Sequence, residues 1–196
     1  MEKLNSLIRN KQTKTFLLVF GSFLFLPIIY AVSKTSIPTE KYTSIYTSIS
    51  KGNCRAVSTD DEIESTVLEC NGIANYTLKI LIEDARQSIT VISPQKKEFP
   101  LDYWQVITPY FSFLGDKAEW RILKTNNKIT PISLIVRVNA TEQKTVDGEI
   151  KQVSYLAVAK ITPKKICVTN KIPPIKNANK IARLAADKST NKPCLQ

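Results

Sequence analysis

Short segments of alternating or β-branched hydrophobic residues recur along the chain after residue 60, a pattern typical of β-strands. Strands are expected at residues 66–70, 76–82, 88–92, 120–123, 132–138 and 153–161. Turn-forming residues separate the first of them, with Asn71-Gly72 after one strand and Glu83-Asp84-Ala85 after the next. The pattern therefore predicts a mainly antiparallel sheet.

The last two expected strands are predicted to form a hairpin. Asp147-Gly148 lies near their midpoint and favours a tight reversal. Folding the chain at that point places Val138 opposite Ala157. In the same register Leu134 lies opposite Ile161, which gives the hairpin one continuous apolar face.

Two segments favour helices instead. Residues 101–108 have room for two helical turns before Pro109 stops them. Asn177 or Asn179 can cap a second helix that runs to Lys188, with a buried side formed by Ile181, Leu184 and Ala185. The fold class expected from these elements is α+β, a mainly antiparallel sheet with one or two short helices.

The first 33 residues have the character of an export sequence. An apolar run from Phe16 to Val32 follows four basic residues and a single acidic one. The small residues Ala31-Val32-Ser33 make cleavage before Lys34 plausible, and a retained membrane anchor is the alternative. We therefore expect residues 1–33 to be a signal peptide or an anchor. Residues 34–196 would form a single exported domain, periplasmic, secreted or held on the outer side of the inner membrane.

All four cysteines follow the apolar run, which favours disulfides formed in an oxidising compartment. Four cysteines allow three pairings. Cys54 and Cys70 are 16 residues apart, with a polar turn between them, and a bridge across a hairpin is the simplest pairing. Cys167 and Cys194 would then join the last strand to the C-terminal tail. The chain has no histidine and no CxxC motif, so neither a metal site nor another cofactor is expected.

Charge narrows the range of partners only slightly. Residues 34–196 hold 24 Lys and Arg against 16 Asp and Glu, a net charge of +8. The lysines are scattered and form no basic block, which is typical of a solvated surface, although anionic lipids or polymers would also suit it. No nucleic-acid-binding motif is present. Contact with a membrane is expected only through residues 16–32, if they are retained.

Catalysis is expected to depend on carboxylates if it occurs at all. Without histidine the chain cannot build a Ser-His-Asp or Cys-His centre. Asp84, Asp102 and Glu119 remain as candidates for a glycan hydrolase that uses two carboxylates. The leading interpretation is a non-enzymatic binding or structural domain of the cell envelope, and such a hydrolase is the alternative.

The best candidate for a binding surface is the aromatic segment 99–120, which contains seven aromatic residues. In a strand, Glu119 and Arg121 share one face, while Trp120 points to the other. The candidate surface consists of Tyr103, Trp104, Glu119 and Arg121. Its expected partner is a protein or an anionic polymer of the envelope.

An ordered set of short motifs resembles a family of small uncharacterised exported bacterial proteins. The motifs are YTSI before Cys54, DARQS at 84–88, LGDKAEWR at 114–121, LIVRV at 134–138, VAKITPKKICV at 158–168, and NANKIARLAAD before Cys194. They extend over residues 42–194. The resemblance implies export and two cysteine pairs, and it implies no activity.

Overall fold

The computed structural model describes residues 41–60, 62, 64–125, 128–143 and 145–196. These residues belong to one compact unit, Pro38–Gln196. The expected leader at residues 1–33 lies outside the described residues. Neither helix in the described part of the chain is long and apolar enough to span a membrane.

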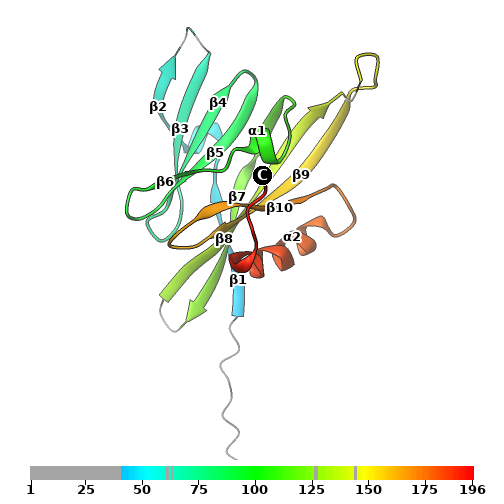
Figure 1. Ribbon diagram of the computed structural model, residues 1–196. Helices are drawn as coiled ribbons and strands as arrows, with labels where there is room; N and C mark the ends of the chain where they lie inside the picture. Colours follow the sequence, from blue (N-terminus) through cyan, green and yellow to red (C-terminus); the bar gives the residue numbers. More distant parts are fainter. Residues whose placement is uncertain (1–40, 61, 63, 126–127, 144) are drawn as a thin grey trace, which may run out of the picture. The chain divides into compact units, whose positions relative to one another are not determined.

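In the part of the chain that the structure describes, ten strands form one mainly antiparallel sheet (Figure 1). They are β1 (Lys41–Ser48), β2 (Arg55–Asp60), β3 (Ser65–Asn71), β4 (Thr77–Glu83), β5 (Arg86–Ile92), β6 (Glu98–Pro100), β7 (Ser112–Thr125), β8 (Lys128–Glu142), β9 (Lys151–Ile161) and β10 (Ile166–Ile172). Their order is β10-β9-β8-β7-β5-β4-β3-β2, with β1 on β7 and β6 on β5. The expected antiparallel sheet is confirmed, and the helices are so few that α+β describes the fold only loosely.

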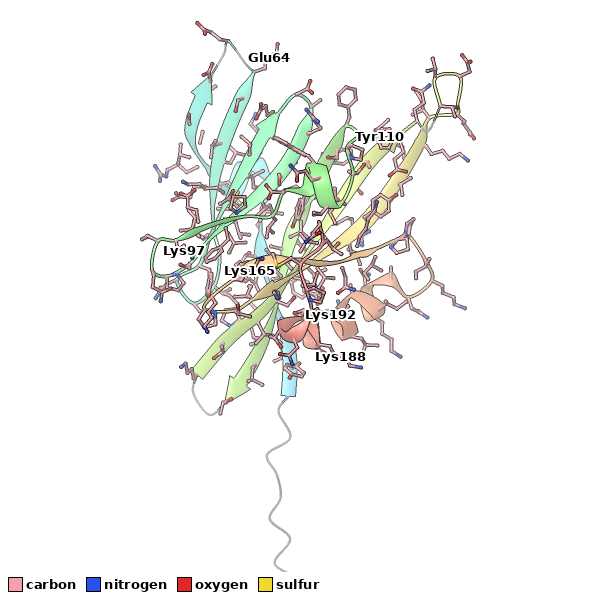
Figure 2. All side chains as sticks on the ribbon, viewed as in Figure 1. Glu64, Lys97, Tyr110, Lys165, Lys188 and Lys192 are labelled. Atoms are coloured by element: carbon pink, nitrogen blue, oxygen red, sulfur yellow. A yellow bond between two sulfur atoms is a disulfide. The ribbon has the colours of Figure 1, made fainter. Side chains whose placement is uncertain are left out.

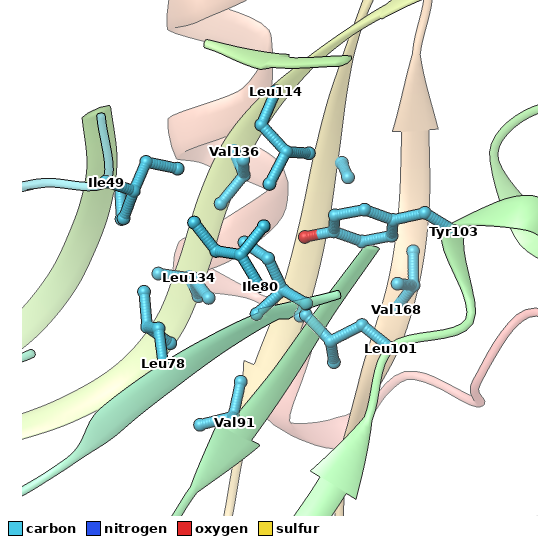
Figure 3. Close-up of a cluster of buried hydrophobic side chains, with 14 of the residues drawn as sticks. Ile49, Leu78, Ile80, Val91, Leu101, Tyr103, Leu114, Leu134, Val136 and Val168 are labelled. Atoms are coloured by element: carbon cyan, nitrogen blue, oxygen red, sulfur yellow. The ribbon is translucent and has the colours of Figure 1, made fainter. Parts of the chain in front are cut away.

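The sheet folds into two layers because β5 and β7 share just one parallel pair, Arg86 with Ser112. Strands β2 to β6 form one layer, and β1 with β7 to β10 forms the other. Leu78 and Val91 from the first layer pack with Leu134 and Trp120 from the second in one core cluster. Figure 3 shows part of this core. At the borders of the layers β1 contacts β3 and β6 contacts β10.

The β8–β9 hairpin forms with a register different from the expected one. Val138 pairs with Tyr155 rather than Ala157, a displacement of two residues. The turn closes earlier than expected because Gly148 is its last residue, with the Gly148 N–H donating to the Thr145 carbonyl at 2.9 Å. A displacement of two keeps every side chain on its expected face, so the apolar face survives.

Helix α2 (Ala178–Asp187) packs on the outer face of β8, β9 and β10, while α1 (Tyr103–Val106) is a single turn. The predicted buried side of α2 is wrong for its two largest residues. Ile181 is 37% exposed and Leu184 is 52% exposed, whereas Ala182 and Ala186 are fully buried. Alanine on the contact face lets the helix lie close to the sheet, and the larger side chains point away from it.

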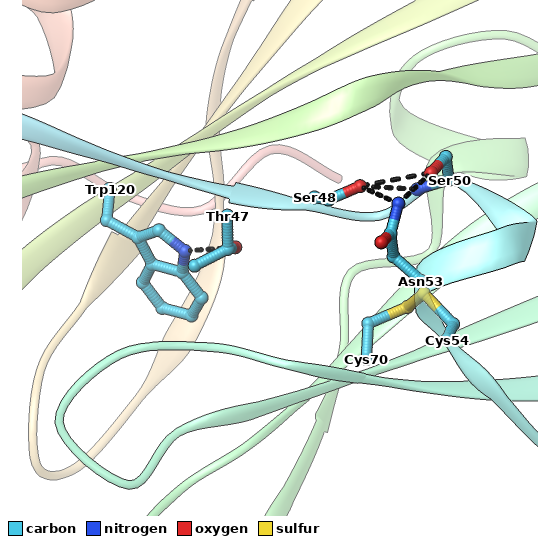
Figure 4. The surroundings of a disulfide bond; sticks show 7 residues. All are labelled: Thr47, Ser48, Ser50, Asn53, Cys54, Cys70 and Trp120. Atoms are coloured by element: carbon cyan, nitrogen blue, oxygen red, sulfur yellow. Dashed lines mark hydrogen bonds between the residues drawn. A yellow bond between two sulfur atoms is a disulfide. The ribbon is translucent and has the colours of Figure 1, made fainter.

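Both cysteine pairs favoured by the spacing form disulfides. Cys54 follows the short 3₁₀ helix η1 (Lys51–Asn53) and joins Cys70 at the base of the β2–β3 hairpin, with 4.4 Å between the Cα atoms (Figure 4). Cys167 on β10 joins Cys194, which follows the 3₁₀ helix η2 (Ser189–Asn191) in the C-terminal tail. The tail lies along β10, where the Leu195 N–H donates to the Val168 carbonyl at 2.8 Å. Two disulfides indicate an oxidising environment.

Candidate functional site

The four residues of the predicted binding surface lie in three different surroundings. Tyr103 is fully buried, and its ring lies in the core with the hydroxyl pointing inward (Figure 3). This burial raises the pKa of Tyr103 well above its ordinary value. Trp104 is half-buried beside Arg86. Glu119 and Arg121 lie on the opposite face of β7 from the core, next to α2. The four therefore do not form one continuous surface.

Glu119 and Arg121 both hold α2 against the sheet. The Arg121 guanidinium makes two hydrogen bonds to the Asp187 carboxylate, at 2.8 and 2.9 Å. Arg183 Nε donates to Glu119 Oε1 at 2.6 Å, and the Ser44 hydroxyl donates to the same oxygen at 2.6 Å. Burial alone would raise the pKa of Glu119, but these hydrogen bonds and the Arg183 charge hold it below its ordinary value.

The aromatic segment does contribute to a hollow elsewhere on the molecule. This hollow, here called the aromatic hollow, has a volume of about 360 Å³ and lies among the β4–β5 turn, the start of β7 and the β8–β9 hairpin. It is lined by Asp84, Arg86, Pro109, Tyr110, Phe111, Thr141, Gln143 and Ile150. Its apolar side chains are unusually accessible, with Phe111 58% exposed and Ile150 60% exposed. Figure 2 shows Tyr110 beside the β8–β9 hairpin.

The backbone holds Phe111 in place from both sides. The Ser112 N–H donates to the Ala85 carbonyl at 3.2 Å, and the Thr141 N–H donates to the Phe111 carbonyl at 2.9 Å. The segment is thus tied to the β4–β5 turn and to β8 at once. Its exposed ring is presented by a fixed backbone rather than by a free loop, and such preorganisation lowers the entropy cost of binding.

Arg86 supplies the positive charge of the aromatic hollow. Its Nη2 donates to Asp84 Oδ2 at 2.8 Å, and its guanidinium carbon lies 5.1 Å from the centre of the Trp104 ring. Arg86 Nε, Trp104 Nε1 and Ser112 Oγ are buried and have no hydrogen-bond partner within the described part of the chain. Buried polar atoms without partners are rare. Of these three residues, Arg86 lines the hollow, and the three atoms themselves lie beneath the surface.

The β4–β5 turn that carries Asp84 and Arg86 has an unusual backbone. Asp84 and Ala85 have φ angles of 49° and 54°, and Glu83 pairs with Arg86 across the turn. A two-residue turn with both φ angles positive twists in the same sense as the strands, although glycine and asparagine usually occupy it. The sequence analysis predicted this turn. It did not predict that Arg86 lines the aromatic hollow. No local signal links Arg86 to the distant residues Phe111 and Ile150.

A second hollow of about 360 Å³ is lined by Glu142, Gly148, Glu149, Lys151, Val153 and Tyr155. The Tyr155 hydroxyl donates to Glu142 Oε1 at 2.7 Å, and Lys171 Nζ lies 4.0 Å from the centre of the Tyr155 ring. Burial, followed by the hydrogen bond and the charge of Glu142, raises the pKa of Tyr155 to about 12. The sequence analysis did not identify this hollow.

The three carboxylates of the predicted hydrolase belong to different parts of the fold. Asp84 lies in the β4–β5 turn, Asp102 precedes α1, and Glu119 is held by Arg183 at the α2 contact. Of these three, the aromatic hollow is lined by Asp84 alone. Within the described residues, no three Cys, Asp or Glu side chains are grouped so that they could hold a metal ion.

No protein-family model, curated protein or solved structure matches this chain. The resemblance to exported bacterial proteins therefore remains a prediction that rests on the short motifs and the two cysteine pairs.

Proposed function

We propose that residues 34–196 form a non-enzymatic binding domain of the cell envelope, which holds a protein partner in the aromatic hollow. The observation that carries the proposal is the exposed ring of Phe111, fixed by its backbone beside Ile150 and the Arg86 cation. Aromatic residues and arginine are enriched at protein interfaces. The Arg86 side chain is 29% exposed and forms an ion pair with Asp84 beside the ring. The two disulfides support the extracytoplasmic setting.

Affinity capture from the native envelope tests the proposal with two matched variants. Phe111→Ala removes the ring that lines the aromatic hollow, while Phe113→Ala removes an equally large ring that is 52% exposed outside it. We expect Phe111→Ala to weaken binding of the captured protein at least about tenfold, in the range of an interface hot spot. Phe113→Ala should leave the affinity nearly unchanged.

Titration of each purified variant with the captured partner gives the dissociation constants. Equal affinities for the two variants would contradict the proposal. If an anionic polymer is enriched and no protein is, the partner is the envelope polymer that the sequence analysis gives as the alternative.

The alternative, a glycan hydrolase with two carboxylates, is favoured by one observation only. Glu142 and Glu149 line the second hollow together, although Glu149 is exposed and pairs with Lys151 at 3.5 Å. Release of reducing sugar ends from envelope glycans, abolished by Glu142→Gln, would support this alternative. The same assay with Phe111→Ala would separate it from the binding proposal, because that variant leaves both carboxylates in place.

A further inference from the structure

The strand directions sort charged residues to opposite ends of the domain. The β2–β3, β4–β5 and β8–β9 turns lie at one end, and they or the strand ends beside them carry Asp60, Glu62, Glu64, Glu83, Asp84, Asp147 and Glu149. Two described basic residues lie there as well, Arg86 paired with Asp84 and Lys151 paired with Glu149, so this end is mainly but not wholly acidic. The β5–β6, β7–β8 and β9–β10 turns lie at the other end, because β5, β7 and β9 all run toward it. Figure 2 shows Glu64 at one end and Lys97 and Lys165 well away from it.

The second group of turns and the strand ends beside them form a surface that we call the lysine end. It consists of Lys96, Lys97, Lys124, Lys128, Lys164 and Lys165, all of them exposed. None of these lysines forms an ion pair with any residue that the structure describes. Ile129, beside Lys128, adds an apolar side chain that is 42% exposed. Lys97 Nζ also lies 5.0 Å from the centre of the Phe99 ring, and Glu98 at this end is paired with Lys79. Six lysines that are scattered in the sequence thus lie at one end of the domain without an acidic partner among the described residues.

The chain enters the domain at this same end. The first residue of β1, Lys41, pairs with Lys124 at the end of β7, next to the β7–β8 turn. Only eight residues separate Lys41 from the apolar run at 16–32. A stretch of that length spans at most about 30 Å when fully extended.

We propose that the lysine end docks on an anionic lipid bilayer. Charge complementarity carries the proposal, because lysines near an anionic membrane surface are attracted to it and their contributions add. The point of chain entry supports the same partner, since a retained apolar run would keep this end near the lipid. The proposal concerns a surface different from the aromatic hollow and does not depend on the function proposed for it.

Hydrogen exchange of the full chain in nanodiscs tests the proposal. The chain is synthesised without cells, under oxidising conditions, into nanodiscs of phosphatidylcholine alone or mixed with phosphatidylglycerol in equal parts. We expect the amides of residues 95–97, 162 and 164–166 to exchange more slowly in the anionic discs. The protection should disappear at high salt, and residues 64–66 at the acidic end should show no change.

Two double variants with the same change in net charge complete the test. Lys164→Glu with Lys165→Glu reverses two charges of the lysine end, and Lys176→Glu with Lys180→Glu reverses two exposed lysines near α2. In the anionic nanodiscs, the Lys164 and Lys165 double variant should have a ratio of docked to undocked domains at least about tenfold lower than the unaltered protein. The Lys176 and Lys180 double variant should differ little from the unaltered protein.

Equal exchange in the two kinds of nanodisc would overturn the proposal. An equal loss of protection in both double variants would also overturn it, since net charge alone would then explain the binding. If soluble polyphosphate protects the same turns in phosphatidylcholine discs more strongly than phosphatidylglycerol does, the surface recognises an anionic polymer rather than a bilayer.

Discussion

Individual glycines in this fold differ sharply in what surrounds them. A Cβ atom added to Gly72 would lie 2.6 Å from the Tyr76 carbonyl oxygen and 2.8 Å from Cζ2 of Trp120. Trp120 is fully buried and donates from its indole N–H to Thr47 at 2.9 Å (Figure 4), so it has little freedom to move. Gly52, by contrast, has no atom within 4 Å of such a Cβ. The sequence marks Gly72 as a turn residue, but only the packing shows that it must be small.

We predict that Gly72→Ala lowers the free energy of unfolding by about 1–3 kcal/mol, because the methyl group forces the backbone or the indole to move. Gly52→Ala should change it by no more than about 1 kcal/mol. Urea unfolding followed by tryptophan fluorescence measures both. A Gly72 variant as stable as the Gly52 variant would show that the β3–β4 turn relaxes freely.

At the scale of elements, α2 is attached more by polar contacts than its sequence suggests. Its apolar contact uses alanines, while Arg183 and Asp187 bind Glu119 and Arg121 on β7. The hydrophobic pattern placed Ile181 and Leu184 toward the sheet. An amphipathic pattern alone cannot show that arginines of the sheet and of the helix will form ion pairs beside the contact.

The lowered pKa of Glu119 predicts how this attachment depends on pH. The unfolded chain binds a proton at this residue at a higher pH than the folded chain does, so the stabilisation is complete above the ordinary glutamate pKa of about 4.3 and is lost as the pH falls through the folded value. Glu119→Gln should reduce stability at pH 7 by about 1 kcal/mol, given that Arg183 is 40% exposed.

The difference between Glu119→Gln and the unaltered protein should be smaller at an acidic pH below the lowered pKa of Glu119 in the folded protein than at pH 7, because Glu119 is then neutral in both states. Chemical unfolding at the two pH values measures it. A difference that stays constant between them would mean that the Glu119 charge does not stabilise the fold.

At the scale of the whole molecule, the disulfides secure the two extreme strands of the sheet. Cys54–Cys70 closes the hairpin of β2, whose residues are all exposed, and Cys167–Cys194 holds the tail along β10. Within the described sheet, strand β2 pairs on one side only and has no buried residue, whereas β10 places Ile166 and Val168 in the core. Cys54–Cys70 therefore secures a strand that the core does not hold, and Cys167–Cys194 fixes the C-terminal tail to a strand that the core does hold.

Replacing either pair by alanine should lower the free energy of unfolding. The loop-entropy argument gives about 3 kcal/mol for Cys54–Cys70 and about 3.5 kcal/mol for Cys167–Cys194, whose separations are 16 and 27 residues. Denaturant unfolding of each double variant, with and without reductant, measures the contributions. Reductant should lower the free energy of unfolding of each double variant only by breaking the disulfide that remains. A double variant with the same free energy of unfolding as the unaltered protein would contradict the entropic account.

Much of the fold was predictable because its signals are local. The six strands expected from alternation correspond to β3, β4, β5, β7, β8 and β9, and the favoured cysteine pairs have short separations in the chain. Strands β1, β2, β6 and β10 have no counterpart among the six, and β7 begins at Ser112 rather than at Trp120. The predicted register of the β8–β9 hairpin is wrong by two residues, because the position of the closing turn depends on a single backbone hydrogen bond from Gly148. The candidate site was less predictable. Aromatic residues between 99 and 120 were the right type, but burial separated Tyr103 in the core from Phe111 at the surface.

The sequence by itself determined six of the strands, several places of reversal and the absence of histidine chemistry, and it favoured the cysteine pairing that forms, since each depends on neighbouring residues or on composition. Only the tertiary structure decided which aromatic rings stay exposed, which carboxylates are used in ion pairs, and that scattered lysines gather at one end. These properties depend on contacts between residues far apart in the chain, such as Glu119 with Arg183. The packing of the two layers and α2 creates those contacts, and no local pattern encodes them.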